Sequence, residues 1–446
     1  MADKRQAHNG RIRTRKTTVN DEEEEEDVVK KEDEFYPLLK QLQSIQLIHK
    51  QEHLQKAYRF WHTQPVPQFH ETLIKSVSCP HGPIDMSQKM LQNVRQDPYH
   101  LPAGFTWSIL NLMDLSDRNQ VYELLARNYV EDSASKFRFD YSVNFLQWAL
   151  TPPGFHKDWH IGVRSTTNYK LMAFVSGIPV KIRVYKETLQ MAEINFLCVH
   201  KRLRDRRLAP VLIKEVTRRV NLSNVWQAIY TAGVMLPMPI AQCRYFHRPL
   251  NPKKLVEVGF SPLSPQTTLA QKIKTFTLPA HTLTPFLRPM ERIDVSKVAK
   301  LLREYLTKFH LAVELSEEEV AHWMVPRVGV VNTYVVENPN TEEITDVCSF
   351  YHLPSTIIGD DKHKKLYAVY SFYNVAKSVT LTQLMQDALI MAKKEHADVF
   401  NALDVMENIE MLQPLKFGPG TGELQYYLYN WRCPRMSSDC VGIVLC

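Results

Sequence analysis

The chain has 446 residues, 44% of them hydrophobic and 10% aromatic, so it is long enough to bury two or three compact cores. This composition excludes a chain that is disordered throughout, and 14 glycines against 26 prolines exclude a collagen-like repeat. The net charge of +7 is a mild basic excess for this length, and we expect no DNA partner from it.

Neither a membrane span nor a disulfide framework is expected. The longest apolar run, residues 171–180, is shorter than the roughly 18 residues that a span needs, and it contains Ser176 and Gly177. The charged N-terminus lacks the apolar segment of a secretion signal. The seven cysteines are scattered without a CxxC pair, which is typical of reduced thiols. We therefore predict a cytoplasmic protein and, since nothing argues for an oligomer, a monomer.

Residues 1–34 form a charged tail that differs from the rest of the chain. The first twenty residues contain six lysines or arginines and one acid, and residues 21–27 are all acidic. Charge blocks of this kind bury too little apolar surface to fold. Two interpretations stay open: a solvated leader, or a segment that docks on an anionic surface such as ribosomal RNA or acidic lipid.

From residue 35 onward, apolar patterns predict a mixture of strands and helices. Strands are expected at residues 170–178, 192–200, 328–337, 345–353, 366–374, 399–406 and 424–431. Helical spacing predicts helices over residues 209–222, 296–311 and 382–394, and Ser316 with Glu319 forms a capping box that opens another. With no internal repeat, this mixture indicates an α/β or α+β fold. A Ser/Thr/Pro-rich stretch, residues 261–284, is a candidate seam between two halves.

The strongest candidate for a ligand site joins a predicted strand to a predicted helix. Residues 193–201 read Glu-Ile-Asn-Phe-Leu-Cys-Val-His-Lys, and the next six residues include four arginines: Arg202, Arg204, Arg206 and Arg207. Pro210 then lies in the first helical turn, where its missing N–H is not needed. A helix N-terminus with added positive charge binds phosphate, so we predict a pyrophosphate cradle rather than a solvated loop. The absence of GxGxxG and GxxxxGK[ST] motifs argues against a dinucleotide fold and an NTPase.

Three other patterns are weaker. His156 and His160 have the spacing of a zinc-binding helix, but no third ligand follows at metal spacing, so no metal site is expected. Cys243 and His247 could form a nucleophile and its base, although two such residues four apart are usually structural. The Gly-rich stretch at residues 418–422 either lets a ligand approach the backbone or forms a hairpin turn, and the turn is favoured.

Residues 193–201 match the signature E-I-N-F-L-C-x-H-K at every fixed position, so the chain resembles the eukaryotic N-myristoyltransferases. Further matches follow in the family's order at residues 60–67, 137–141, 231–233, 250–252, 287–290, 349–351, 353–356, 371–374, 401–404 and 425–431. The resemblance implies transfer of a C14 acyl chain from myristoyl-CoA, a co-substrate and not a permanent cofactor, to the N-terminal glycine amine of proteins. It also implies two acetyltransferase-like (GNAT) halves with pseudo-twofold symmetry and a mixed central sheet flanked by helices.

The resemblance also implies a division of labour. After the tail, residues 35–262 would bind myristoyl-CoA, and residues 263–446 would bind the peptide and return the C-terminal carboxylate to the active site. The residues carried over to the acyl-CoA site are Arg59, Phe60, Trp61, Phe196, Leu197, Cys198, Val199, Asp205, Arg207, Leu208 and Ala209. Those carried over to the peptide groove are Tyr129, Asp132, Phe137, Phe139, Gly233, Tyr245, His247 and Ser349.

The implied chemistry needs an oxyanion hole and a base. The backbone N–H groups of Phe196 and Leu197 would stabilise the negative charge that forms on the thioester oxygen. The attacking α-amino group has a pKa of about 7.7–8.0 and must lose a proton. The resemblance gives this task to the C-terminal carboxylate, here on Cys446, while Asn195 and Thr231 would help to place the amine.

Several positions depart from the family's pattern. Thr421 stands where the signature K-F-G-x-G-D-G has aspartate, and Ser133 and Ala134 stand in a stretch that is usually richer in aspartate. These acids receive a basic residue of the substrate, so weaker selection for lysine is expected here, with Asp132 remaining. Asp205 adds a negative charge beside the phosphates. The alternatives left open are an enzyme with a relaxed peptide preference, an enzyme that acylates lysine side chains, and a paralogue that binds acyl-CoA or acyl-peptide without turnover.

Overall fold

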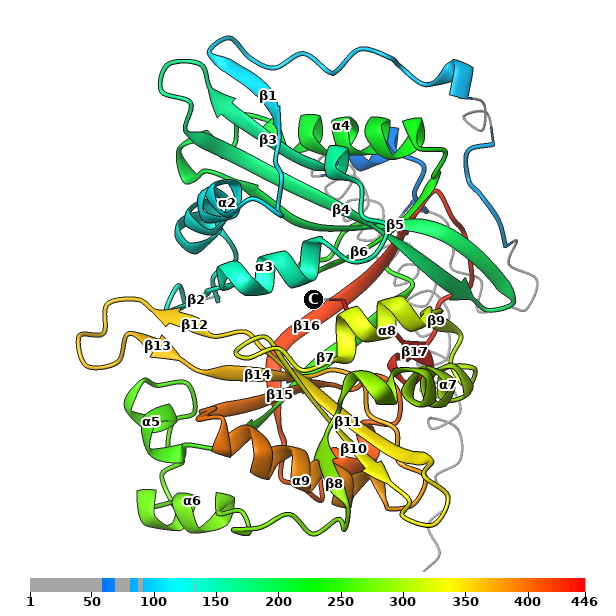
Figure 1. Ribbon diagram of the computed structural model, residues 1–446. Coiled ribbons are helices and arrows are strands. Elements are labelled where there is room, and N and C mark those ends of the chain that lie inside the picture. Colours follow the sequence, from blue (N-terminus) through cyan, green and yellow to red (C-terminus); the bar gives the residue numbers. More distant parts are fainter. Residues whose placement is uncertain (1–57, 69–80, 87–90, 133, 446) are drawn as a thin grey trace, which may run out of the picture. The chain divides into compact units, whose positions relative to one another are not determined.

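The computed structural model describes residues 58–68, 81–86, 91–132 and 134–445. One unit, Met1–Arg59, has only its last two residues described, and the other, Phe60–Cys446, is a single compact unit. The predicted charged tail at residues 1–34 lies outside the described residues. Figure 1 shows the arrangement of helices and strands in the second unit.

One large mixed sheet runs through this unit and confirms the predicted mixed α/β class. In spatial order its strands are β1 (Phe105–Ile109), β3 (His160–Ser165), β4 (Leu171–Val184), β5 (Glu187–Val199), β6 (Gln227–Ala232), β16 (Gly418–Tyr429), β7 (Ala241–Pro249), β15 (Val399–Leu403), β14 (Ala368–Ser371), β11 (Ile344–His352), β10 (Val331–Glu337) and β8 (Leu287–Pro289). Two further strands, β9 (Leu311–Val313) and β17 (Val441–Gly442), pair with each other, and β9 also pairs with β4. A separate small sheet contains β13 (Lys365–Leu366), β12 (Ser355–Ile357) and β2 (Phe137–Phe139).

The sheet does not stop between the two predicted halves. Strand β16, from the C-terminal part of the chain, lies between β6 and β7 (Figure 1). The candidate seam at residues 261–284 contains a helix, α6 (Leu269–Phe276), and leaves the sheet continuous. The division after residue 262 and the pseudo-twofold relation of the halves stay predictions.

Helices cover the sheet: α2 (Leu115–Asn128), α3 (Val143–Leu150), α4 (Leu208–Leu222), α5 (Pro252–Glu257), α7 (Val295–Leu306), α8 (Glu317–Met324), α9 (Leu381–Lys394) and α10 (Ile409–Leu412). The helices predicted over residues 209–222 and 382–394 are confirmed as α4 and α9. The capping box is also confirmed, since Ser316 accepts from the Glu319 N–H and the Glu319 side chain accepts from the Ser316 N–H at the start of α8. No helix of the described residues is long and apolar enough to cross a membrane.

Two expectations were wrong in their extent. The helix predicted over residues 296–311 ends at Leu306, because Leu311 pairs in β9 with β4 and this tertiary pairing overrides the helical spacing. The Gly-rich stretch at residues 418–422 is not a hairpin turn but the first part of β16, with a register shift against β7. The other predicted strands coincide with β4, β5, β10, β11, β13 with β14, β15 and β16, within a few residues at most ends.

The largest hydrophobic core connects elements that are far apart in sequence. Phe145 of α3, Phe196 of β5 and Tyr426 of β16 are all almost fully buried in it, together with Val441 of β17. The Trp148 indole N–H, also in this core, donates to the carbonyl of His322 in α8. The core therefore fixes β5 against the C-terminal segment of the chain.

Candidate functional site

Strand β5 carries a β-bulge inside the signature. Ser176 of β4 pairs with Asn195 of β5, and Phe174 of β4 pairs with Cys198 of β5. A step of two residues along β4 therefore corresponds to a step of three residues along β5. The extra residue lies at Phe196–Leu197, and Phe196 has a φ of 55°, a left-handed conformation that costs energy for a side chain of this size. A bulge takes backbone groups out of the regular ladder and is common beside active sites.

The polar residues next to the bulge form a connected set. The Asn195 side-chain oxygen Oδ1 accepts from the Phe196 N–H at 2.8 Å, and the Ser176 hydroxyl donates to the Asn195 carbonyl at 2.9 Å. Glu193 is hydrogen-bonded to the Asn195 side chain. Burial raises the pKa of Glu193 to about 8, and the bond from Asn195 only partly offsets this.

Three of the predicted catalytic residues, Asn195, Phe196 and Thr231, lie just beyond the paired segment of two parallel strands. Glu193 of β5 pairs with Ile229 of β6, so Asn195 and Thr231 follow two residues later on neighbouring strands. Thr231 is half-buried and pairs on its other side with Tyr426 of β16. Gly233, just beyond β6, is exposed.

The C-terminal segment is anchored to the same place. The Tyr426 hydroxyl, opposite Thr231, donates to the Ile443 carbonyl at 3.0 Å, and the Val444 N–H donates to the Tyr373 hydroxyl at 3.3 Å. Cys446 lies outside the described residues, but the chain is held to within two residues of it.

A cavity separates this segment from β5. Glu193 contributes its carboxyl to the wall, Glu319 of α8 contributes a second, and residues 443–445 form one side. The other lining residues are apolar or aromatic. The cavity therefore brings the neighbours of the C-terminal carboxylate to the same surface as the signature strand.

The predicted phosphate loop has the backbone of an anion site. Asp205 and Arg207 both have positive φ, 64° and 55°, and α4 begins immediately after them at Leu208. No side chain caps the N–H groups of this helix, and the half-buried Ala209 lies in its first turn. Uncapped N–H groups after such a turn form a concave donor surface for phosphate.

The arginines of this loop have different roles. Arg206 and Arg207 are exposed, and neither forms an ion pair with any residue that the structure describes, which also holds for Arg202. Arg204 instead donates to the carbonyl of Asn128 at the end of α2, so it holds the loop in place.

Of the residues predicted to close on the CoA, Trp61 has a defined position. Its ring stacks on Tyr230 of β6, 5.8 Å between centroids and 7° between planes, and Tyr230 stacks in turn on Tyr427. Phe60 contacts the Trp61 ring edge-on. Arg59 is exposed and belongs to the other unit of the chain.

The remaining acyl-CoA candidates lie on β5. Cys198 is buried, and burial raises the pKa of its thiol to about 12, so it is not a ready nucleophile. Val199 is the last residue of the strand and is half-buried.

Three of the eight predicted peptide residues, Tyr129, Phe139 and Tyr245, belong to one path of aromatic contacts that starts at the bulge. Tyr129 stacks on Phe196 with centroids 6.0 Å apart, and Tyr141 contacts both rings at 5.8 and 4.9 Å. Phe139 follows, 5.9 Å from Tyr141, and the path continues to Tyr370, which lies 6.5 Å from Phe139 and 6.1 Å from Tyr245.

His247 and Phe137 belong to a second group of aromatic contacts, which is joined through Phe260. The His247 ring lies 5.3 Å from Phe260, which lies 5.6 Å from Phe137, and its Nδ1 is 2.6 Å from the Asn401 side-chain oxygen. Burial lowers the pKa of His247, with the Asn401 bond opposing it. Gly420 must be glycine here, because a Cβ would lie 2.9 Å from the Tyr245 carbonyl and overlap the His247 ring.

Ser349 does not fit the predicted groove. It is fully buried, and its hydroxyl donates to the Tyr373 carbonyl at 2.8 Å and accepts from the Tyr373 N–H at 2.9 Å. Both capacities of the hydroxyl serve the backbone beside it, so Ser349 has a structural role.

The two acids that remain near the groove are already engaged. Glu131 accepts from Lys201 at 2.6 Å and from Arg138 at 2.8 Å, and these bonds, first that from Lys201, hold the pKa of Glu131 at about 2. Asp132 accepts from the backbone N–H groups of Lys136 and Phe137 at 2.6 and 2.7 Å. Glu131 therefore neutralises cations of the protein itself, and Asp132 accepts hydrogen bonds from its backbone.

The weaker sequence patterns do not form sites. His160 is fully buried in β3, and burial lowers the pKa of its ring to about 4, whereas His156 stacks on Trp159. No group of three possible metal ligands exists among the described residues. Cys243 and His247 lie four residues apart on an extended strand, a separation of about 13 Å, too far for a nucleophile and its base.

The comparisons with known proteins identify the family of the chain. Residues 83–243 match the model of the N-terminal domain of myristoyl-CoA:protein N-myristoyltransferase, and residues 257–443 match that of its C-terminal domain. Glycylpeptide N-tetradecanoyltransferase 1 of Arabidopsis thaliana is 54% identical over 84% of this chain and 86% of its own. The chain belongs to the N-myristoyltransferase family.

Other members of the family are similarly close. Glycylpeptide N-tetradecanoyltransferase 2 of Bos taurus is 54% identical over 87% of this chain and 76% of its own length. The structure of Saccharomyces cerevisiae N-myristoyltransferase with bound myristoyl-CoA superposes with a TM-score of 0.82 at 40% identity, covering 87% of this chain and 99% of that one.

Sequence reasoning missed Tyr370, Phe260 and Glu193 as members of the site. Tyr370 and Phe260 lie in ordinary apolar runs, and only the pairing of distant strands brings them beside Tyr245 and His247. Glu193 was inside the signature, and a carboxyl group in an otherwise apolar strand was the signal that could have singled it out.

Proposed function

We propose that this protein transfers a myristoyl group from myristoyl-CoA to the N-terminal glycine amine of proteins. Membership of the family supports this activity, and the names of its relatives describe the same transfer. The observation that carries the proposal is the β-bulge at Phe196–Leu197, which lies between the phosphate loop on one side and the C-terminal segment on the other.

In this proposal the bulge supplies the oxyanion hole. The N–H groups of Phe196 and Leu197 donate to the thioester oxygen as the amine attacks the carbonyl carbon. Losing one such donor in other acyl-transfer enzymes costs about 10²–10³ in rate. The N–C bond forms, the C–S bond breaks, and CoA leaves as a thiol.

The proton of the glycine ammonium goes to the C-terminal carboxylate of Cys446. The anchoring of Ile443 by Tyr426 and of Val444 by Tyr373 supports this role, because a base must be held within reach of the proton that it removes. Asn195 and Thr231 would place the amine, since they follow one another across β5 and β6 beside this segment.

Myristoyl-CoA would bind through the phosphate loop and β5. Asp205, Arg207, Leu208 and Ala209 would hold the phosphates, with charge from Arg206 and Arg207, while Trp61 on Tyr230 would close over the CoA. Arg59, Phe60, Cys198 and Val199 complete the proposed set.

The peptide would lie along the aromatic path from Tyr129 to Tyr245 and His247, with Gly233 near its first residue. Since Glu131 and Asp132 are engaged within the protein, and Ser133, Ala134 and Thr421 carry no charge, we propose weak selection for a lysine in the substrate. This favours the alternative of relaxed peptide specificity over an enzyme that requires a basic residue.

We further propose that the chain acts as a cytoplasmic monomer, with residues 35–262 mainly binding acyl-CoA and residues 263–446 mainly binding peptide. The separate family matches to residues 83–243 and 257–443 support that division. Docking of residues 1–34 on ribosomes or another anionic surface is part of the same proposal.

The direct test is the identity of the product. The purified protein is incubated with myristoyl-CoA and an octapeptide that begins with glycine, or with a matched octapeptide that begins with alanine. The mass of each peptide is then measured by mass spectrometry. We expect one myristoyl group on the glycine peptide and none on the alanine peptide. Failure to modify the glycine peptide would reject the proposed activity.

A further inference from the structure

The proposed oxyanion-hole donor already has a partner within the protein. The Asn195 oxygen Oδ1 lies 2.8 Å from the Phe196 nitrogen, inside the range of about 2.7–3.1 Å that an oxyanion would occupy. The bulge removes this N–H from the regular ladder, and Phe196 itself is almost fully buried. A buried donor without a partner costs about 1–3 kcal/mol, so an internal acceptor stabilises the free site.

We propose that Asn195 is a placeholder for the substrate: its Oδ1 caps the Phe196 N–H until the thioester carbonyl oxygen of the acyl-CoA displaces it. This inference rests on the proposed function, because it needs Phe196 to be an oxyanion donor. The net gain from the carbonyl is then small in the ground state, since one hydrogen bond replaces another.

The surroundings of Asn195 fit a side chain that moves while its backbone stays. Its carbonyl is held by the Ser176 hydroxyl at 2.9 Å, within the β4–β5 ladder. Its side chain is also bonded to Glu193, which lies two residues earlier on the same face of β5 and lines the cavity. The amide therefore keeps one partner when the Phe196 N–H is released.

The test compares two unreactive ligands. One is a ketone analogue of myristoyl-CoA with a methylene between sulfur and carbonyl, and the other is the matching alkyl thioether without the carbonyl oxygen. The dissociation constant of each is measured by calorimetry for the wild type, Asn195→Ala, Asn195→Asp and the control Ser176→Ala, which removes a bond to Asn195 but leaves the cap.

In the wild type, we expect the two ligands to bind with similar affinity. In Asn195→Ala, the Phe196 N–H is free, and the ketone should gain about three- to tenfold over the thioether, the value of one hydrogen bond. Asn195→Asp keeps an acceptor oxygen and adds charge, so the ketone should bind more weakly relative to the thioether than it does in the wild type. In Ser176→Ala, the ratio of the two dissociation constants should match that of the wild type.

An unchanged ratio in Asn195→Ala would overturn the inference. If that variant does not fold, a ratio in Asn195→Asp at or above the wild-type value would overturn it instead. If neither ligand binds the folded wild type, it is the proposed function that fails, and the two failures are thereby distinguished.

Discussion

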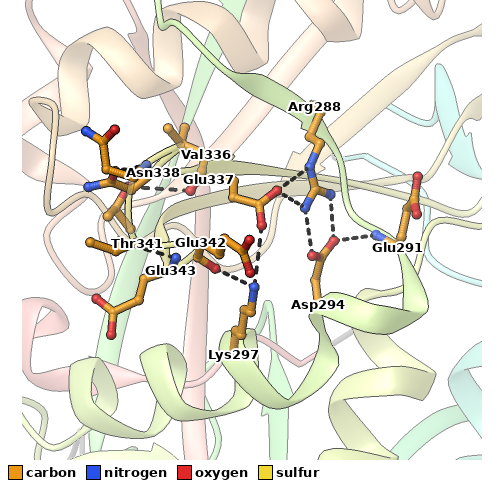
Figure 2. A network of polar contacts seen from close by, with 12 residues as sticks. Arg288, Glu291, Asp294, Lys297, Val336, Glu337, Asn338, Thr341, Glu342 and Glu343 are labelled. Atoms are coloured by element: carbon orange, nitrogen blue, oxygen red, sulfur yellow. Dashed lines mark hydrogen bonds and ion pairs between the residues drawn. The ribbon is translucent and has the colours of Figure 1, made fainter.

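Two groups of arginine side chains in this molecule have opposite surroundings. Arg288 is paired with two acids: its guanidinium bonds Asp294 at 2.7 Å and Glu337 at 2.7 Å, and Lys297 lies 3.4 Å from Glu337 (Figure 2). Arg206 and Arg207, before α4, are exposed and form no ion pair with the part of the chain that the structure describes.

The difference separates charges that build the fold from charges kept for a ligand. Asp294 is almost fully buried, also accepts from the Glu291 N–H at 2.8 Å, and would be left unpaired without Arg288. Removing Arg206 and Arg207 would break no ion pair among the described residues, whereas both add positive charge beside uncapped N–H groups.

The largest effect should come from the proposed base. Deleting Cys446 removes the carboxylate from its place, and single-turnover transfer should fall by at least about 100-fold, as expected for a general base. Cys446→Ala is the matched control, because it keeps the carboxylate and loses only the thiol, and it should stay within about threefold of the wild type. Equal rates for the deletion and the wild type would remove the carboxylate from the mechanism.

The next effect sharpens the contrast between the arginines. Arg206→Ala with Arg207→Ala should weaken myristoyl-CoA binding by about 10–100-fold, the value of charge-assisted hydrogen bonds, with little change in kcat at saturation. Titration calorimetry gives the affinity. Arg288→Ala is the control and should bind myristoyl-CoA like the wild type; weaker binding in that variant would erase the distinction.

For the free energy of unfolding, the order of the two variants should be reversed. Arg288→Ala leaves Asp294 buried without its partner and should lower the free energy of unfolding by about 1–3 kcal/mol. The double loop variant should change it by less than about 0.5 kcal/mol, as for other surface substitutions. Urea denaturation measures both, and a larger loss in the loop variant would contradict the assignment.

The smallest effect is a pH dependence of stability. The pKa of Glu193 is raised to about 8 in the folded protein, so the folded protein binds a proton at this carboxyl more tightly than the unfolded chain does. Its contribution is therefore fully favourable below the unfolded value of about 4.3 and is lost as the pH rises through about 8. Glu193→Gln lacks this loss, so the wild-type Tm should fall relative to that of the variant between pH 5 and pH 8. Parallel Tm curves would contradict the burial of this carboxyl.

Much of the fold follows from local pattern, and the rest depends on distant partners. The periodicity of α4 and α9 and the cap at Ser316 are local signals, and they were read correctly. The end of α7 was not, because only the pairing of Leu311 with β4 decides it. The glycine-rich stretch at residues 418–422 looked like a turn, but it is part of β16, and only the close approach of Tyr245 and His247 explains why Gly420 is glycine.

The candidate site was predictable in its signature and not in its pairings. The strand, the basic loop and the helix at residues 193–222 could be placed from the sequence. That Glu131 is neutralised by Lys201, seventy residues later, and that the Ser349 hydroxyl serves Tyr373, depend on tertiary contacts. The φ of 55° at Phe196 opposes the local preference of phenylalanine, so no propensity argument could find the bulge.

The most direct test of the central claim is the release of free CoA from myristoyl-CoA with two octapeptides. Both begin with glycine and carry serine at position five; one has lysine and the other alanine at position seven. We predict turnover with both at similar efficiency, because the chain transfers the acyl group and because Glu131 and Asp132 are already engaged within the protein. A strong preference for the lysine peptide would contradict the relaxed specificity, and tight myristoyl-CoA binding with no CoA release would contradict the enzyme itself.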